Sequence, residues 1–319
     1  MRDRPIINVM MGLPGSGKSY VAKNELSGII ISSDDIREEL FGDINSQQDN
    51  NMVFMTLHSR ICALLQEGKD VIFDATNIHR KNRIHFLKNV LNNIDCNKIC
   101  HCVMTPYKLC LKRNAERKRV VPKYVIKRMY MNWEPPHRTE GWDEIVFHID
   151  DESKAIINNE YNYDIFGKDD WDLMNFDQDN LHHQLSLGEH ILKTYIEVVN
   201  NYPNDIILSV AASLHDIGKP FTKTYKKANG KNDGQAHYYN HENTGAYESF
   251  FYIQNMININ KYKFNSRDIE DITTIINYHM RPYTAWKQSE KAMIRDRERL
   301  GEILFNKIIY LNEADKKAH

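Results

Sequence analysis

The feature that most constrains the fold is a glycine-rich octapeptide near the start of the chain, Gly12-Leu13-Pro14-Gly15-Ser16-Gly17-Lys18-Ser19. It follows the apolar, strand-like run Ile6–Met11 and precedes a helical stretch. Such a loop points backbone N–H groups at phosphate oxygens, which requires glycines, and the next helix adds its positive dipole end. We therefore expect an α/β nucleotide-binding domain in which this loop holds ATP or another nucleoside triphosphate. Lys18 would contact the β- and γ-phosphates, and Ser19 would bind Mg²⁺.

The first half of the chain continues this alternation of strand-like and helix-like stretches. Segments such as Gln47–Gln66 and Lys81–Leu91 are long enough for helices. The alternation predicts a largely parallel sheet with both faces covered. The expected strands are the apolar, β-branched runs Ile6–Met11, Gly28–Ser32, Val71–Asp74, Ile99–Met104 and Ile145–Ile149.

The pattern changes after Asp150. Residues 151–180 hold nine acidic residues and two lysines, are rich in Asn and Asp, and show weak periodicity. Strand-like runs are then nearly absent. We expect a P-loop domain over 1–152, an acidic connector over 153–180 and an all-α domain over 181–319. The helical stretches are Leu187–Asn200, Ile206–His215, Thr244–Met256, Ser266–Tyr278 and Glu302–Asn312.

Composition agrees with two domains and narrows the protein class. A chain of 319 residues exceeds the size of one ordinary domain. The five cysteines all lie between Cys62 and Cys110, which favours reduced thiols over a disulfide framework. No apolar run approaches the roughly 18 residues of a membrane helix, and the first residues do not resemble a signal peptide. We expect a soluble, cytoplasmic protein with no membrane partner.

The net charge of −1 conceals an asymmetry. Residues 1–150 hold 22 Lys and Arg against 18 Asp and Glu, whereas the remainder holds 20 against 25. Residues 108–128 carry nine basic side chains and one acid, Glu116. This segment suggests a local anionic ligand, although a solvated helix face would have the same composition.

Three further clusters in the first half suit phosphoryl transfer. Ser33-Asp34-Asp35-Ile36-Arg37 follows a strand, so a carboxylate and an arginine lie where α/β sheets bind ligands; one of the two aspartates is also a candidate helix cap. Asp74-Ala75-Thr76-Asn77 lacks the glutamate that activates water in motor ATPases, which favours transfer to a hydroxyl. The run Arg113–Arg119 can form a lid over the phosphates.

Together, GLPGSGKS, SSDDIR, DATN and RNAER resemble the polynucleotide 5′-kinase family over roughly residues 5–150. The resemblance implies Asp34 as general base and Arg37 as a contact to the acceptor's phosphate. It also implies Asp74 as a support of the site and Arg117 as the lid arginine. Related P-loop kinases act on small metabolites, so the acceptor stays open.

The second half concentrates histidines beside acids. Imidazole and carboxylate together suit divalent transition metals. Leu214-His215-Asp216-Ile217-Gly218-Lys219 places a His-Asp pair at a helix end, which is an unusual way to cap a helix. The candidates are His182, His183, His190, His215, Asp216, His237, His241, His279 and Asp315.

This pattern resembles the HD phosphohydrolase superfamily over roughly residues 181–319. The resemblance implies a metal set of His190, His215, Asp216, His241, His279 and Asp315. It implies hydrolysis with Mn²⁺, Co²⁺, Ni²⁺, Zn²⁺ or Fe²⁺, in which two ions near Asp216 lower the pKa of a water and Lys219 steadies the phosphate. The roles of His182, His183 and His237 stay open.

A phosphate-adding and a phosphate-removing module in one chain suggest a bifunctional RNA end-healing enzyme. The kinase would phosphorylate 5′-OH ends, and the HD domain would remove 2′,3′-cyclic, 2′- or 3′-terminal phosphates. The expected partners are nucleic-acid ends, RNA rather than DNA, and a separate RNA ligase. The alternatives are a nucleoside or metabolite kinase fused to a nucleotidase, and a nucleotide-dependent switch with a sensing HD domain.

Overall fold

The structure is a computed structural model that describes residues 4–46, 48–117, 119–161, 175–179 and 185–318. Contacts divide it into two compact units. The first comprises residues 1–129 and 136–153, and the second comprises 130–135 and 154–319. Of the connector expected over 153–180, residues 153–160 belong to helix α7, whereas 162–174 and 180 lie outside the described residues.

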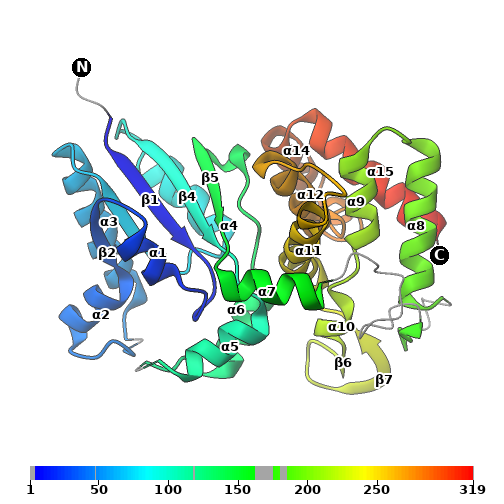
Figure 1. Ribbon diagram of the computed structural model, residues 1–319, viewed down its shortest axis with the longest axis horizontal. Helices are drawn as coiled ribbons and strands as arrows, with labels where there is room; N and C mark the ends of the chain where they lie inside the picture. Colours follow the sequence, from blue (N-terminus) through cyan, green and yellow to red (C-terminus); the bar gives the residue numbers. More distant parts are fainter. Residues whose placement is uncertain (1–3, 47, 118, 162–174, 180–184, 319) are drawn as a thin grey trace. The chain divides into compact units, whose positions relative to one another are not determined.

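The first unit contains a five-stranded parallel sheet in the order β2-β3-β1-β4-β5 (Figure 1). The predicted α/β class is confirmed, and each expected strand lies within two residues of its observed bounds. The central strand β1 is buried at five of its six positions, because helices cover both faces of the sheet. The strands are β1 (Ile6–Met11), β2 (Ile29–Ser32), β3 (Val71–Asp74), β4 (Asn97–Val103) and β5 (Glu144–His148).

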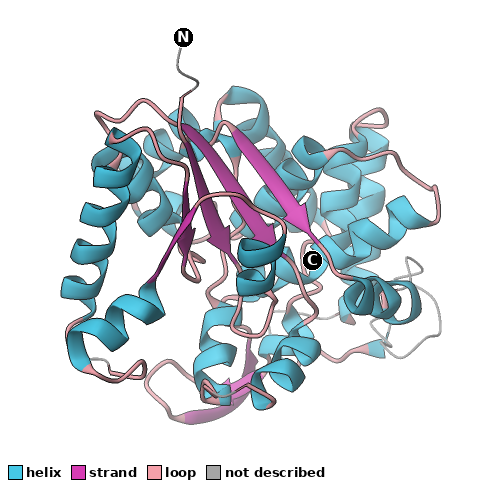
Figure 2. Cartoon of the chain, turned by 60° about the vertical axis from the view of Figure 1, so that its left-hand side comes forward, coloured by secondary structure: helices cyan, strands magenta, loops and turns pink. Residues whose placement is uncertain are grey.

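The helices of this unit follow the strands along the chain. Figure 2 shows helices around the strands of the sheet. Helix α1 packs Val21 and Ala22 on Met10, Ile72 and Val103 of the sheet. The helix expected over Lys81–Leu91 is shorter, because its last part is a π-helical turn. The segments are α1 (Lys18–Asn24), α2 (Ser33–Phe41), α3 (Asn50–Gln66), α4 (Arg80–His85), η1 (Phe86–Val90), α5 (Tyr107–Ala115), α6 (Lys123–Met131, up to Met129 in this unit) and η2 (Arg138–Glu140).

A buried ion pair joins α4 to the 3-10 turn η2. Glu140 accepts hydrogen bonds from both Nε and Nη2 of Arg83 at 2.8 and 2.7 Å, and both side chains are about 1% exposed. Trp142 Nε1 donates to the same carboxylate at 3.1 Å, and Arg83 Nη1 donates to the carbonyl of Asn77 at 3.0 Å. The pair therefore fixes the segment that follows strand β3.

We expect Glu140→Ala to destabilise the first unit by about 3–5 kcal/mol, because it leaves the Arg83 guanidinium buried without its counter-charge. Chemical denaturation followed by circular dichroism measures the loss. Glu144→Ala is a control, since Glu144 is an exposed acid on β5. Equal midpoints for the two variants would contradict this account of the ion pair.

The second unit is mostly helical, as the sequence predicts. Ser266–Tyr278 is a helix over the predicted range, whereas the helix expected over Thr244–Met256 extends from His241 to Asn258. The helices are α7 (Asp151–Glu160, from Lys154 on), α8 (Leu187–Asn201), α9 (Ile206–Leu214), α10 (Lys219–Thr222), α11 (His241–Asn258), α12 (Ser266–Tyr278), α13 (Ala285–Gln288), α14 (Glu290–Leu300) and α15 (Glu302–Lys317).

The second unit also contains one short hairpin that the sequence did not predict. An antiparallel hairpin of β6 (Thr224–Lys226) and β7 (Asn232–His237) separates α10 from α11. Its strands are short and mostly polar, so they lack the apolar alternation that marks a strand in a sequence.

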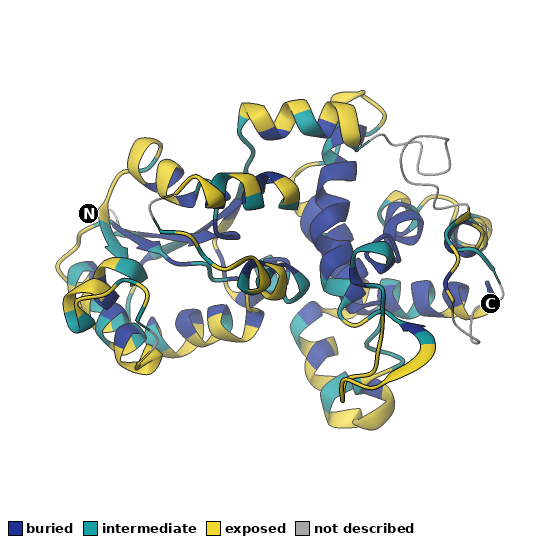
Figure 3. Cartoon of the chain, turned by 90° about the horizontal axis from the view of Figure 1, so that it is seen from below, coloured by how far each residue is buried: buried dark blue, intermediate teal, exposed yellow. Residues whose placement is uncertain are grey.

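The core of the second unit centres on α11 and α12, which carry long runs of buried residues (Figure 3). Tyr247, Phe250 and Phe251 of α11 are fully buried. A buried carboxylate on the same helix, Glu248, accepts hydrogen bonds from the hydroxyls of Tyr130 and Tyr161. Among the described residues, no helix is long and apolar enough to cross a membrane.

Candidate functional sites

The glycine-rich loop has the backbone geometry that the motif predicts. Gly12, Gly15 and Gly17 have φ angles of 152°, 85° and 95°, a region that L side chains rarely adopt. Gly15 also lies against helix α5, where an added Cβ would come within 2.3 Å of the carbonyl oxygen of Cys110. Both the backbone angles and the contact with α5 therefore require glycine at position 15.

Two polar groups of the loop, the Lys18 ammonium and the Ser16 hydroxyl, are suited to bind an anion. The Lys18 side chain is buried and donates to the carbonyl of Leu13 at 2.8 Å. Burial lowers the pKa of its ammonium group, and Asp74 offsets this only in part. The buried hydroxyl oxygen of Ser16 has no hydrogen-bond partner within the described part of the chain. A triphosphate fits here, since it would supply both a counter-charge and acceptors.

Ser19 and Asp74 come together from neighbouring elements. Ser19 lies at the start of α1 and Asp74 at the end of β3, which pairs with β1. The Ser19 hydroxyl donates to Asp74 Oδ2 at 3.0 Å. A hydroxyl and a carboxylate in contact suit Mg²⁺, which takes oxygen ligands.

A cavity of about 440 Å³ opens beside the loop. Gly17, Tyr20 and Val21 line one side, and Val103 and His148 line another. Its walls are largely apolar, as expected for a pocket that receives a ring system next to polar groups. It is the candidate position for the nucleoside of the triphosphate.

The proposed acceptor side is an ionic cluster on α2. Asp34 is 3.4 Å from Arg37 and forms a second ion pair with Arg119. Arg37 is held by Asn50, whose side-chain oxygen accepts from its Nη2 at 2.7 Å. The sequence analysis named Asp34 and Arg37 and placed Arg119 in the lid run, but it named neither Asn50 nor the pairing of Arg119 with Asp34.

The arginines of the basic segment 108–128 have different partners. Arg119 faces Asp34, and Arg117 lies close enough to Lys18 for its charge to lower the pKa of that lysine further. Arg113 instead forms ion pairs with Asp150 and Glu152 at 2.6 and 2.8 Å. The lid expected over 113–119 therefore includes one arginine that anchors the segment.

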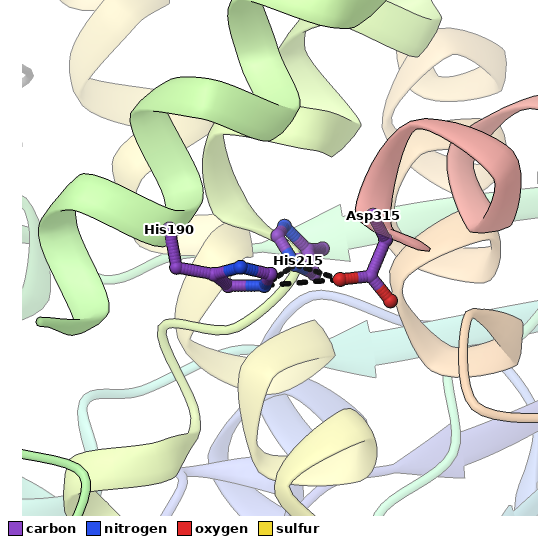
Figure 4. Close-up of side chains that lie close together, drawn as sticks. All are labelled: His190, His215 and Asp315. Atoms are coloured by element: carbon purple, nitrogen blue, oxygen red, sulfur yellow. Dashed lines mark hydrogen bonds and ion pairs between the residues drawn. The ribbon is translucent and has the colours of Figure 1, made fainter. Parts of the chain in front are cut away.

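In the second unit, the six predicted metal ligands converge from five places in the chain. They form two buried groups, each with ligand atoms within 4.8 Å of one another. Figure 4 shows the first group, in which His190 of α8, His215 at the end of α9 and Asp315 of α15 face a common point. The groups are His190, His215 and Asp315, and Asp216, His241 and His279.

Asp216 joins the two groups, because its two carboxylate oxygens face different histidines. Oδ2 is 3.4 Å from Nε2 of both His190 and His215. Oδ1 is 3.2 Å from Nε2 of His241 and 3.5 Å from that of His279. One carboxylate that faces two ligand groups is suited to bridging two cations.

Backbone carbonyls set the orientation of three of these rings. The Nδ1 atoms of His215, His241 and His279 lie 2.6–2.8 Å from the carbonyl oxygens of Ala212, Tyr238 and Ile276. A carbonyl only accepts, so each Nδ1 donates to it and each Nε2 is directed at the centre. Nε2 of His241 and Nε2 of His279 are 3.2 Å apart. Two ring nitrogens held this close suit a shared cation, to which neutral rings would offer their Nε2 lone pairs.

The charges of Asp216 and its neighbours also favour a bound cation. Burial alone would raise the pKa of Asp216, but Lys219, His215 and His190 outweigh it and hold the pKa well below its usual value. Burial lowers the pKa of His190, but Asp216 and Asp315 outweigh it and raise the pKa to about 9. These carboxylates stay charged and require positive charge around them, as a divalent ion would supply.

Outer contacts that the sequence did not reveal hold this centre. Tyr283 donates its hydroxyl to Asp315 Oδ2 at 2.8 Å. Lys219 Nζ is 2.7 Å from Asp216 Oδ2 and 2.8 Å from the side-chain oxygen of Gln178. His237 lies outside both groups and contacts Asp233 at 3.1 Å. His182 and His183 lie outside the described residues.

A close backbone contact brings the two halves of the centre together. Gly218 follows Asp216 by two residues and lies against the first turn of α11. An added Cβ on Gly218 would be 2.0 Å from the carbonyl oxygen of His241 and 2.5 Å from the nitrogen of Gly245. Only a glycine therefore lets His241 approach Asp216 this closely.

We expect Gly218→Ala to displace α11, to lower the metal content of the purified protein and to cost about 1–3 kcal/mol of stability, as overpacking does. Gly245→Ala is the matched control, because its added Cβ would meet no described atom closer than 3.4 Å. Metal content by mass spectrometry and thermal melting test this. Wild-type metal content in Gly218→Ala would refute it.

Comparisons with known proteins agree with the architecture of the first unit. Residues 7–136 match the family model described as an AAA domain. Together with the loop geometry and the parallel sheet, this match shows that the first unit is a P-loop domain. The L-seryl-tRNA(Sec) kinase of Methanococcus maripaludis is 28% identical over 164 residues, which cover 47% of this chain and 61% of that protein. The chain thus spans about three fifths of this relative's length.

Two solved structures are similar to part of this chain. The Pnkp1/Rnl/Hen1 RNA repair complex matches at 23% identity and a TM-score of 0.35, over 40% of this chain and 44% of that one. A sugar kinase from Janibacter sp. HTCC2649 matches at 17% identity and a TM-score of 0.34, over 45% and 85%.

Proposed function

We propose that this protein heals RNA ends with two active sites. The first unit phosphorylates 5′-OH ends with ATP and Mg²⁺, and the second removes 2′,3′-cyclic, 2′- or 3′-terminal phosphates with divalent transition metals. The observation that carries this proposal is the convergence of His190, His215, Asp216, His241, His279 and Asp315 in a chain that also holds a P-loop domain. The P-loop residues suit the addition of a phosphate, and the His and Asp residues suit its removal. A downstream RNA ligase would be the partner that uses the products.

In the kinase reaction, the loop and Lys18 hold the β- and γ-phosphates, and Ser19 and Asp74 hold Mg²⁺. Asp34 takes the proton of the attacking 5′-hydroxyl while the oxygen bonds to the γ-phosphorus and ADP leaves. Arg37 holds the acceptor's own phosphate, and Arg117 with Arg119 neutralises the charge that develops on the transferred group. The relative named as a seryl-tRNA kinase supports transfer to a hydroxyl as the reaction class.

In the hydrolase reaction, the six His and Asp ligands would hold one or two divalent ions, which supply Lewis acidity for the attack of water on the phosphorus. Backbone carbonyls keep the His215, His241 and His279 rings aimed inward. Tyr283 fixes Asp315, and Lys219 brings a positive charge to the phosphate.

One substrate tests both activities: an RNA oligonucleotide with a 5′-OH and a 2′,3′-cyclic phosphate. We expect a 5′-phosphate that depends on ATP and a 3′ end that loses its phosphate when metal is present. Mononucleosides and mononucleotides serve as competing substrates. Phosphorylation of the small acceptors alone would favour a metabolite kinase, and nucleotide binding without turnover would favour a sensor.

A further inference from the structure

The hairpin β6–β7 is inserted between two parts of the metal centre. It follows Lys219 and helix α10 and ends four residues before His241. The chain therefore leaves the centre just after Lys219, forms the hairpin, and returns to the centre at His241. The hairpin is short and irregular, because the three-residue β6 pairs with the six-residue β7 across a register shift.

The hairpin carries more lysines than acids. Residues 223–237 carry four lysines, at positions 223, 226, 227 and 231, and a single acid, Asp233. Lys227 is 3.1 Å from Asp233, and Lys223 is 2.7 Å from Asp179. Lys226 and Lys231 are exposed and form no ion pair within the described ranges. Two positive charges at the tip are therefore available to an anionic partner.

Aromatic rings accompany the lysines. Tyr225 and Tyr239 are 42% and 41% exposed, so a large part of each residue is open to solvent. The rings of His237 and Tyr239 are stacked, with centroids 5.6 Å apart and an interplanar angle of 12°. Exposed rings interleaved with lysines are the combination with which proteins hold single-stranded nucleic acids, by base stacking and phosphate contacts. An acidic peptide would use the lysines but not the stacked rings.

The base of the hairpin is fixed to the metal centre by the segment 175–179. Gln178 accepts from Lys219, and its backbone carbonyl accepts from the Tyr238 hydroxyl at 2.5 Å. Asp179 accepts from Tyr225 at 2.6 Å, and its carbonyl accepts from the nitrogen of Ala236 at 2.8 Å. The hairpin and Lys219 therefore share one set of anchors, which sets the direction of a ligand leaving the centre.

We propose that the hairpin β6–β7 is the docking surface for the RNA strand whose terminal phosphate enters the metal centre. The proposal rests on the hydrolase function given above. The terminal phosphate meets Lys219, the next phosphates meet Lys226 and Lys231, and the bases stack on the exposed rings. The hairpin thereby favours the end of a polynucleotide over a free nucleotide.

The test compares Lys226→Ala/Lys231→Ala with the matched control Lys261→Ala/Lys263→Ala in the full-length protein. The control lysines are also exposed but lie between the end of α11 and the start of α12, at the ends of these helices that are remote from His241 and His279. Both variants remove two positive charges. Two substrates are used: an RNA oligonucleotide with a 2′,3′-cyclic phosphate, and a nucleoside 2′,3′-cyclic monophosphate.

We expect the hairpin variant to raise KM for the oligonucleotide about 10- to 30-fold at 0.1 M salt, because two phosphate contacts are lost. Its kcat and its hydrolysis of the mononucleotide stay at the wild-type level. The slope of log affinity against log salt falls by about 1.4, at roughly 0.7 per contact for a single strand. The control variant shows neither change.

Two results would overturn the proposal: oligonucleotide kinetics equal to those of the control variant, or an equal loss on both substrates, which would mean that the hairpin shapes the metal centre itself. If the wild-type protein hydrolyses neither substrate, the hydrolase function fails. In that case, fluorescence anisotropy measures the affinity of the protein for the same RNA, which carries a dye on its 5′ end. This measurement tests the docking surface without hydrolysis. Unchanged affinity and salt slope in the hairpin variant would refute it, and a DNA strand bound equally well would remove its RNA preference.

Discussion

Asp216→Ala is expected to remove bound metal from the second unit and to lower end-phosphate hydrolysis by at least about 100-fold, while 5′-kinase activity stays unchanged. The physical reason is the position of this carboxylate between the two ligand groups, with one oxygen on each. Loss of an outer contact to a ligand alone costs about 10- to 100-fold, and loss of the shared ligand itself should cost at least as much.

Metal content by mass spectrometry and the two-ended RNA assay measure both effects on one preparation. Glu313→Ala is the matched control, because Glu313 is an exposed acid two residues before Asp315 on the same helix. Kinase activity in the Asp216 variant reports that the first unit has folded. Wild-type metal content, or a parallel loss of both activities, would show that Asp216 does not serve a separate hydrolase centre.

Lys18→Ala is the converse experiment, with an expected loss of phosphoryl transfer of about 100- to 1000-fold, typical of removing one group that stabilises transition-state charge. Burial lowers the pKa of this ammonium group. An anion that enters the site therefore stabilises the charged form of Lys18. Hydrolysis of the terminal phosphate should be unaffected. Folding should also be tolerant, because the side chain donates to a single carbonyl in the loop among the hydrogen bonds described.

Steady-state rates with ATP and a 5′-OH oligonucleotide test this, together with a binding titration of ATP. Lys23→Ala is the control, since Lys23 is an exposed lysine on the same helix α1. A kinase rate within about threefold of the wild type would contradict the role of Lys18, as this corresponds to less than 1 kcal/mol.

Much of the fold and the residue types of both sites could be predicted because their signals are local. The apolar runs at Ile6–Met11 and Val71–Asp74 give strands, and the glycines of residues 12–19 specify a loop whatever surrounds it. The His-Asp pair at the end of α9 carries its chemistry in two adjacent residues. The hairpin β6–β7 was missed because polar strands have no such local signature.

The sequence by itself thus determined a P-loop α/β unit, a mostly helical second unit and the candidate residues for a phosphate site and a metal site. The tertiary structure alone decided which of them meet. It placed Arg119 on Asp34 and Tyr283 on Asp315, and it turned Asp216 between two groups of histidines. These contacts join residues 25 to 85 positions apart. Their formation depends on how helices pack, down to the close approach that Gly218 permits, and packing has no short-range pattern to be read.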